Sequence, residues 1–234
     1  MAGPTKLVIG ANGFLGSHVT RQLVAAGHGV RVMLRRTGST RGIDDLDVER
    51  CYGDVLEDDA LRAAMSGCDV VYYCVVDARM WLRDPAPLFR TNVEGLRHVL
   101  DAALGADLKR FVYTSTTGTL AISDTLPVAE NDPHNWDQGG PYIEARVAGE
   151  NLVLSYARDK GLPAVAMCIS TTYGPGDWAP TRTGRCSPGW PPGGSRSTSA
   201  TRRRSWASKT LPGQRFSPRN GAEAASATSS PTGT

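Results

Sequence analysis

Apolar and polar residues follow two alternating patterns along most of the chain. Short apolar runs, typical of buried parallel strands, are separated by segments whose apolar residues recur at helical spacing. The predicted strands lie at 6–10, 29–34, 46–55, 68–76, 109–116 and 163–169. The predicted helices lie at 14–27, 57–67, 86–106 and from about 142 to 160. This alternation predicts an α/β fold, a doubly wound parallel sheet with helices on both faces.

The pattern stops after Pro180. Residues 182–234 contain one Leu, one Phe and no Ile or Val, and they carry nine Lys and Arg against one Glu. Residues 1–181 instead carry 17 Lys and Arg against 22 Asp and Glu. A segment so poor in apolar side chains cannot offset the entropy of ordering its backbone, roughly 1–2 kcal/mol per residue. We therefore predict an ordered domain at 1–181 and a low-complexity, disordered tail at 182–234.

Three interpretations of this tail are open. Its arginines, with aromatic residues for base stacking, would suit nucleic acid, or the tail is a linker. The genetic code favours a third. Reading from the third base of the Arg185 codon permits a sequence with amphipathic helices and a strand, and the middle bases that specify its apolar residues are mostly fixed by the residues present. We interpret the tail as a translation frame-shifted by a base lost near the Arg182 codon, and predict no nucleic-acid partner.

The sequence shows no membrane-spanning run, no signal-peptide pattern and no metal-ligand spacing. No apolar run approaches the roughly 20 residues that span a bilayer, and the N-terminus has no charged region followed by an apolar one. We predict a cytoplasmic protein with no membrane association. The five cysteines form no CxxC pair and, like the four histidines, show no metal-ligand spacing. We interpret the cysteines as buried free thiols and predict no metal site.

The segment GANGFLG, between the first predicted strand and the first predicted helix, has the composition of a phosphate-binding turn. Gly10, Gly13 and Gly16 would permit a tight turn, an approach of pyrophosphate to bare backbone, and close packing of helix on strand. The helix N-terminus would add N–H donors and partial positive charge. The other residues of the turn that we assign to a dinucleotide are Asn12, Phe14 and Leu15. The alternative is a tight turn without a ligand.

The end of the second predicted strand indicates which dinucleotide is bound. An acidic residue there would bind the ribose of NAD, whereas a basic one suits the 2′-phosphate of NADP. Arg35 and Arg36 therefore favour NADP over NAD, unless they are solvated surface arginines. After the third predicted strand, Asp54 and its neighbour Val55 are placed to reach the adenine edge.

With these residues in hand, the chain resembles the extended short-chain dehydrogenase/reductase family, which includes NAD-dependent epimerases/dehydratases and dihydroflavonol-reductase-like enzymes. The resemblance covers roughly residues 5–181 and rests on GANGFLG, GDV, NVEGLRHVL, FVYTST, PYIEAR and YGPGD. The segment ARMWLRDPAPLFRTNVEG is similar to bacterial dihydroflavonol-reductase relatives and hopanoid-associated sugar epimerases. The resemblance implies a Rossmann domain, and it implies that the tail stands where the substrate-binding region follows.

The resemblance also implies roles for single residues. Tyr142 matches the family's general acid/base, and Thr116, or as second choice Ser115, matches the hydroxyl that binds the substrate oxygen. Asn92 matches the asparagine of the fourth helix, and Gly174 with Pro175 matches the loop after the sixth strand. We expect Asn92 to contribute to the cofactor site, and we expect a homodimer formed through the Tyr142 and Asn92 helices.

The chain departs from the family pattern in three ways. Arg146 stands where the family has the lysine that binds the nicotinamide ribose and lowers the pKa of the tyrosine. Val75 and Val76 are bulkier than the small residues expected beside the nicotinamide, and Ile169 replaces a common proline. Arginine keeps the charge of lysine but presents a planar fork and cannot release a proton. We predict that Arg146 supports cofactor binding but slows or alters the chemistry, unless Tyr142 and Arg146 are merely neighbours on a helix surface.

Two functions follow. The first is an NAD(P)-dependent oxidoreductase or epimerase acting on a hydroxyl or ketone of a nucleotide sugar, a sterol-like or a flavonol-like small molecule, with Tyr142 exchanging the proton. The second is a dinucleotide-binding protein without catalysis, because of Arg146 or of the lost substrate region.

Overall fold

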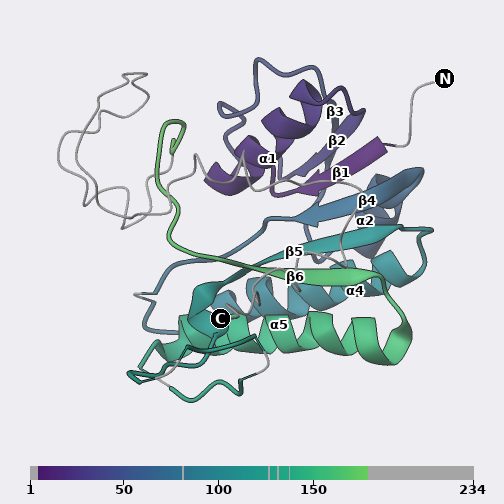
Figure 1. Ribbon diagram of the computed structural model, residues 1–234. Coiled ribbons are helices and arrows are strands. Elements are labelled where there is room, and N and C mark those ends of the chain that lie inside the picture. The colour runs from purple at the N-terminus through teal and green to yellow at the C-terminus, as the bar shows by residue number, and fades with distance from the viewer. Residues whose placement is uncertain (1–4, 81, 126, 131, 137, 179–234) are drawn as a thin grey trace, which may run out of the picture.

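The computed structural model describes residues 5–80, 82–125, 127–130, 132–136 and 138–178. The predicted tail at 182–234 lies outside the described residues. Six strands form one parallel sheet in the order β3-β2-β1-β4-β5-β6, confirming the doubly wound α/β fold (Figure 1). Their bounds are β1 Thr5–Ile9, β2 Val30–Leu34, β3 Glu49–Tyr52, β4 Cys68–Tyr73, β5 Arg110–Thr116 and β6 Ala164–Ile169.

Helices cover the two faces unequally. The helices are α1 Phe14–Ala25, α2 Asp58–Met65, α3 Ala86–Phe89, α4 Gly95–Leu104 and α5 Gly140–Lys160, with a π-helical turn η1 Arg90–Glu94 and a 3-10 turn η2 Thr117–Thr119. Figure 1 shows α4 and α5 side by side below the sheet and α1 on the opposite side. Among the described residues, α1 is the one long helix on its face.

The packing follows the two-residue alternation of each strand. On β1, Leu7 and Ile9 pack with α2, α4 and α5, whereas Val8 packs with Val19 and Leu23 of α1. Both faces of the central strands are therefore buried, which explains why those strands appear in the sequence as continuous apolar runs.

The predicted helix at 86–106 is interrupted. Its middle turn, η1, has π-helical hydrogen bonding, and Asn92 lies within it with 2 % of its surface exposed. Insertions of this kind often occur at functional sites. Apolar spacing did not reveal it, because a single widened turn shifts the helical pattern by only one residue.

The neighbours of β1 define where a ligand would bind. β1 pairs with β2 on one side and with β4 on the other, so the chain order reverses at β1. In open parallel sheets, ligands bind beyond the carboxyl ends of the strands at such a reversal. The turn after β1 and the loop after β4 meet at this point.

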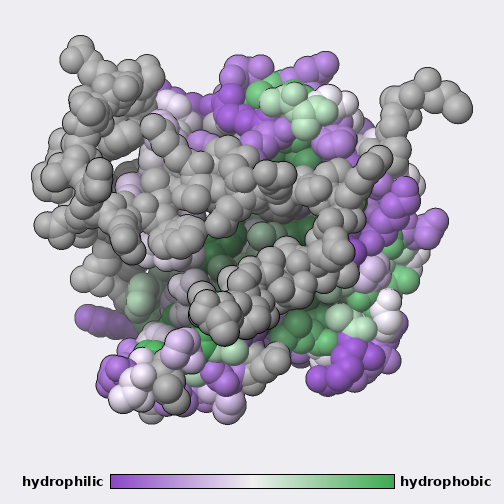
Figure 2. Space-filling view, viewed as in Figure 1, coloured by the Kyte–Doolittle hydropathy of each residue, from purple (hydrophilic) through white to green (hydrophobic). Residues whose placement is uncertain are grey.

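The face of β6 on the α1 side is only partly covered. None of the β6 residues is fully buried, and Met167 is 36 % exposed. Figure 2 shows apolar surface in the middle of the viewed face, with hydrophilic surface around its margins.

Among the described residues, no helix is both long and apolar enough to cross a membrane.

Candidate dinucleotide and active site

Two glycines where β1 meets α1 leave no room for a side chain. Gly10 has a φ of +86°, and a Cβ there would lie 3.0 Å from the backbone of Cys74 and Val75. A Cβ at Gly16 would lie 2.1 Å from the carbonyl oxygen of Gly10. The turn is closed by a hydrogen bond of 3.1 Å from the Gly13 amide to the Gly10 carbonyl. The glycines therefore let α1 begin directly against the ends of β1 and β4.

The N-terminus of α1 has the properties of an anion site. Gly13 is its N-cap, no side chain caps it, and no acidic residue lies in its first turn. The unpaired amides of a first turn, with the helix dipole, favour a phosphate group. The residues present thus fit the pyrophosphate of a dinucleotide.

The remaining residues assigned to this turn flank it. Phe14 packs edge-on against His18, with ring centroids 5.0 Å apart, and Leu15 is half-buried. Asn12 points toward the loop after β2, since a Cβ at Gly38 would lie 2.5 Å from its amide nitrogen. The turn thereby contacts the loop that carries the predicted cofactor-selecting arginines.

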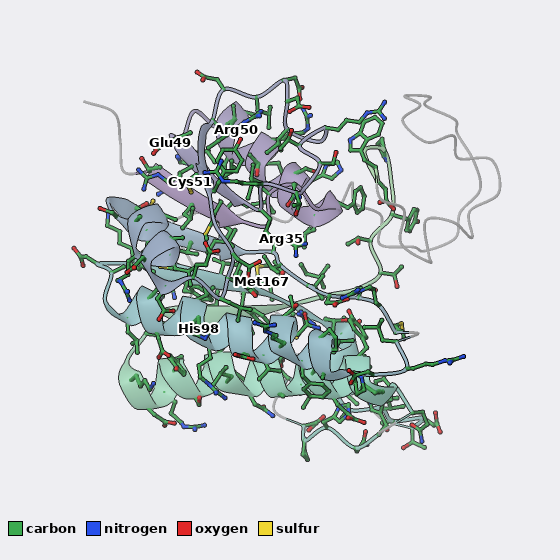
Figure 3. The ribbon with its side chains drawn as sticks, turned by 180° about the vertical axis from the view of Figure 1, so that it is seen from behind. Arg35, Glu49, Arg50, Cys51, His98 and Met167 are labelled. Carbon is green, nitrogen blue, oxygen red and sulfur yellow. The ribbon has the colours of Figure 1, made fainter. Side chains whose placement is uncertain are left out.

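The two arginines after β2 differ in their surroundings. The guanidinium of Arg36 lies over the Tyr52 ring, 4.9 Å from its centroid. Arg35 is exposed beyond the end of β2 (Figure 3). The pKa of Asp77 is lowered, first by hydrogen bonding from Arg79 and to a smaller extent by the charge of Arg35. Arg35 therefore faces the ligand edge of the sheet, whereas Arg36 stacks on β3.

Asp54 and Val55 lie at the end of the next strand. The Asp54 carboxylate accepts a hydrogen bond of 3.1 Å from the Leu56 amide. The side chain of Val55 packs against Gly95, where a Cβ would lie 2.6 Å from it. Both residues therefore lie just beyond the carboxyl end of β3, and their contact with adenine stays a prediction.

Asn92 holds the loop after β4. Its Oδ1 accepts from the Asp77 amide at 2.8 Å and its Nδ2 donates to the Asp77 carbonyl at 2.9 Å. Val75, two residues before Asp77 in the same loop, lies against Gly10. Because both ends of the Asn92 side chain contact backbone, its observed role is to fix this loop. That Asn92 contributes to the cofactor site stays a prediction.

The two hydroxyls at the end of β5 have different partners. The Ser115 Oγ donates to Glu150 on α5. The Thr116 Oγ1 accepts from the Gly118 amide at 3.2 Å and caps η2. Successive strand residues point to opposite faces. The hydroxyl of Ser115 therefore faces α5, whereas that of Thr116 is engaged within the turn that follows β5.

Tyr142 and Arg146 lie on successive turns at the start of α5. Tyr142 is half-buried, and Arg146 is 3 % exposed. The Arg146 guanidinium donates to the Thr114 carbonyl and lies over the Tyr113 ring, 5.1 Å from its centroid. Burial raises the pKa of Tyr113 to about 12, although the charge of Arg146 opposes this shift. Arg146 is thus packed between α5 and β5, which excludes a merely exposed helix-surface position for it.

Gly174 and Pro175 follow β6. The Pro175 carbonyl lies 3.0 Å from the His18 Nε2 of α1. The segment after β6 therefore runs back over the first turns of α1, beside the glycine turn.

Sequence reasoning missed Glu150 and the Asp77–Arg79 ion pair, whose Nε–Oδ1 distance is 2.8 Å. Positions 142, 146 and 150 are four residues apart, so that spacing could have revealed that Glu150 shares the face of Tyr142.

Comparison with known proteins identifies the family. Residues 6–189 match the NAD dependent epimerase/dehydratase family. The chain belongs to this family. A sterol demethylase protein B of Methylococcus capsulatus is 31 % identical over 185 residues, covering 77 % of this chain and 55 % of that protein. A putative dihydroflavonol 4-reductase of Synechocystis is 30 % identical over 179 residues, covering 76 % and 52 %.

A solved structure agrees with this assignment. The UDP-glucose 4-epimerase of Brucella ovis in complex with NAD has a TM-score of 0.66 and 25 % identity, covering 74 % of this chain and 53 % of that one. The family confirms the resemblance drawn from the sequence motifs. The chain spans about half the length of the curated relatives it matches.

Proposed function

We propose that residues 1–181 form a dinucleotide-binding domain that takes a nicotinamide dinucleotide across the carboxyl ends of β1, β2 and β4. The observation that carries this proposal is the glycine turn, where a Cβ at Gly16 would lie 2.1 Å from the Gly10 carbonyl beside an uncapped helix N-terminus. The first-turn amides of α1 would hold the pyrophosphate. Asp54 and Val55 would contact the adenine, and Arg35 would favour NADP over NAD.

The reaction that suits these residues is oxidation, reduction or epimerisation at a hydroxyl or ketone of a small molecule. The nicotinamide supplies or accepts the hydride when bound. Tyr142 would exchange the proton with the substrate oxygen, and Thr116 would hold that oxygen by a hydrogen bond. The names of the relatives make sterol-like, flavonol-like and nucleotide-sugar compounds the substrate classes to test.

Arg146 would contribute positive charge behind Tyr142. A cation near a phenolate stabilises it, but the Arg146 guanidinium donates to the Thr114 carbonyl. Arginine cannot release a proton. We therefore propose that Arg146 preserves the cofactor site while slowing proton exchange.

The same contact supports a second candidate, a dinucleotide-binding protein without catalysis. If the Thr114 carbonyl holds Arg146 permanently, the cation that should act on Tyr142 and the cofactor is engaged elsewhere.

The homodimer through α5 and α4 also stays a proposal, supported by Leu154 of α5, which is 44 % exposed.

Turnover of the three substrate classes with NADPH and NADH distinguishes the two candidates. We predict that Tyr142→Phe lowers kcat by about 10²- to 10⁴-fold, because the proton donor is lost, with cofactor affinity unchanged. Measurable cofactor binding without turnover by the unsubstituted chain on any of these substrates would favour the non-catalytic candidate.

A further inference from the structure

Glu150 joins three elements beneath the proposed site. It lies on α5 two turns after Tyr142, and its Oε2 accepts from Ser115 Oγ of β5 and, at 2.8 Å, from Thr119 Oγ1 of η2. The Sγ of Cys168 on β6 lies 3.7 Å from the same oxygen. Both hydroxyl residues are buried, with Ser115 5 % and Thr119 8 % exposed.

The two hydroxyl donors flank Thr116. Ser115 precedes it on β5, and Thr119 ends the turn that Thr116 caps. The Thr119 Oγ1 also lies 2.7 Å from the Thr116 carbonyl, so the single hydrogen of Thr119 is shared between that carbonyl and Glu150. One carboxylate oxygen therefore anchors the chain on both sides of Thr116.

The turn also determines how Thr116 can interact outward. Its Oγ1 accepts from the Gly118 amide at 3.2 Å. A hydroxyl has one hydrogen and two acceptor lone pairs. With one lone pair used inside the turn, the hydrogen is left to be donated to an oxygen outside it, which is what binding of a substrate hydroxyl or ketone requires.

We propose that Glu150 is a positioning residue that locks the 116–119 turn and so aims the Thr116 hydroxyl at the substrate oxygen. This inference rests on the proposed function, in which Thr116 binds that oxygen. Glu150 itself need not touch the substrate or the cofactor, because it acts through Ser115 and Thr119.

The charge around Glu150 is consistent with an acceptor of hydroxyl hydrogens. The pKa of Cys168 is raised to about 11, first by burial and then by the charge of Glu150. Cys168 therefore remains a neutral thiol at physiological pH, and does not compete as a second anion for the two hydroxyl hydrogens.

Amide hydrogen exchange of the full chain, resolved at Gly118, tests the lock without requiring activity. Glu150→Gln replaces an anionic acceptor by a weaker neutral one, and we expect Gly118 exchange to accelerate about tenfold. Glu144→Gln, an exposed carboxylate on the same helix, is the matched control and should change nothing. If Glu150→Gln fails to fold by circular dichroism, Thr119→Val removes one donor and should accelerate Gly118 exchange in the same direction. Unchanged exchange in the folded variant would overturn the proposal.

Kinetics separates positioning from a purely structural role. We expect kcat of Glu150→Gln to fall about tenfold while the substrate KM and the Kd for reduced cofactor stay within about twofold of those of the unsubstituted chain. Faster exchange with unchanged kcat would overturn the positioning role. If the unsubstituted chain binds cofactor but turns nothing over, the proposed function fails, and the exchange experiment alone decides whether Glu150 locks the turn.

Discussion

Arg146 keeps the charge of a lysine but differs from it in how it hydrogen-bonds. Its side chain is buried, its guanidinium donates to the Thr114 carbonyl, and among the described residues its Nε has no hydrogen-bond partner. A buried polar atom left unpaired is costly, so the site is not ideal for the planar fork of arginine. The compact ammonium of lysine would need no such fork.

We predict that Arg146→Lys raises kcat about tenfold, equivalent to about 1.4 kcal/mol of transition-state stabilisation. The reason is that a compact cation is freed from Thr114 to act beside Tyr142. Steady-state kinetics on the substrates named above measures this, with Arg158→Lys, an exposed arginine on the same helix, as control. An unchanged kcat would contradict the proposal that Arg146 slows proton exchange.

At the scale of elements, the sequence predicted what local patterns specify. The strands and helices, the glycine turn and the Tyr142 helix follow from apolar spacing and from glycines that permit close approach. The sequence did not reveal the π turn at Asn92, the Asn92–Asp77 hydrogen bonds or the Glu150 cluster. The Asn92–Asp77 and Glu150 hydrogen bonds join residues far apart in the chain, which periodicity does not encode, and the π turn shifts the helical pattern by only one residue.

The glycine turn allows a direct test at this scale. We predict that Gly16→Ala weakens dinucleotide binding by at least about tenfold. The new Cβ would lie only 2.1 Å from the Gly10 carbonyl oxygen, so α1 would have to move away from the turn. Gly105→Ala is the control, since its Cβ would lie an ordinary 3.6 Å from the Ala102 carbonyl oxygen. Calorimetric titration measures both, and equal affinities for the two variants would contradict the packing argument.

At the scale of the whole molecule, helices cover the two faces of the sheet unevenly. α2, α4 and α5 bury one face of the sheet, while β6 keeps partly exposed side chains on the α1 side. Large exposed apolar patches mark interaction sites or aggregation liabilities. We propose that a substrate-binding region would cover this face if the reading frame of the tail were restored, a proposal that resequencing the gene tests.

The exposed β6 face predicts binding of an apolar dye. We expect Met167→Glu to lower the fluorescence of an anilinonaphthalene sulfonate dye about twofold, because Met167 is 36 % exposed on that strand and a carboxylate there repels the sulfonate of the dye. Leu154→Glu makes the same change at an exposed side chain of α5 and should have a smaller effect. An equal or larger effect at Leu154 would place the apolar binding surface on α5 instead.

The central claim is that the turn after β1 binds the pyrophosphate of a nicotinamide dinucleotide. Titration of the full chain with NADPH and NADH, followed by calorimetry, tests it most directly. We predict saturable binding of both, tighter for NADPH, with Arg35→Ala abolishing the preference and leaving NADH affinity unchanged. Binding of neither nucleotide would contradict the claim.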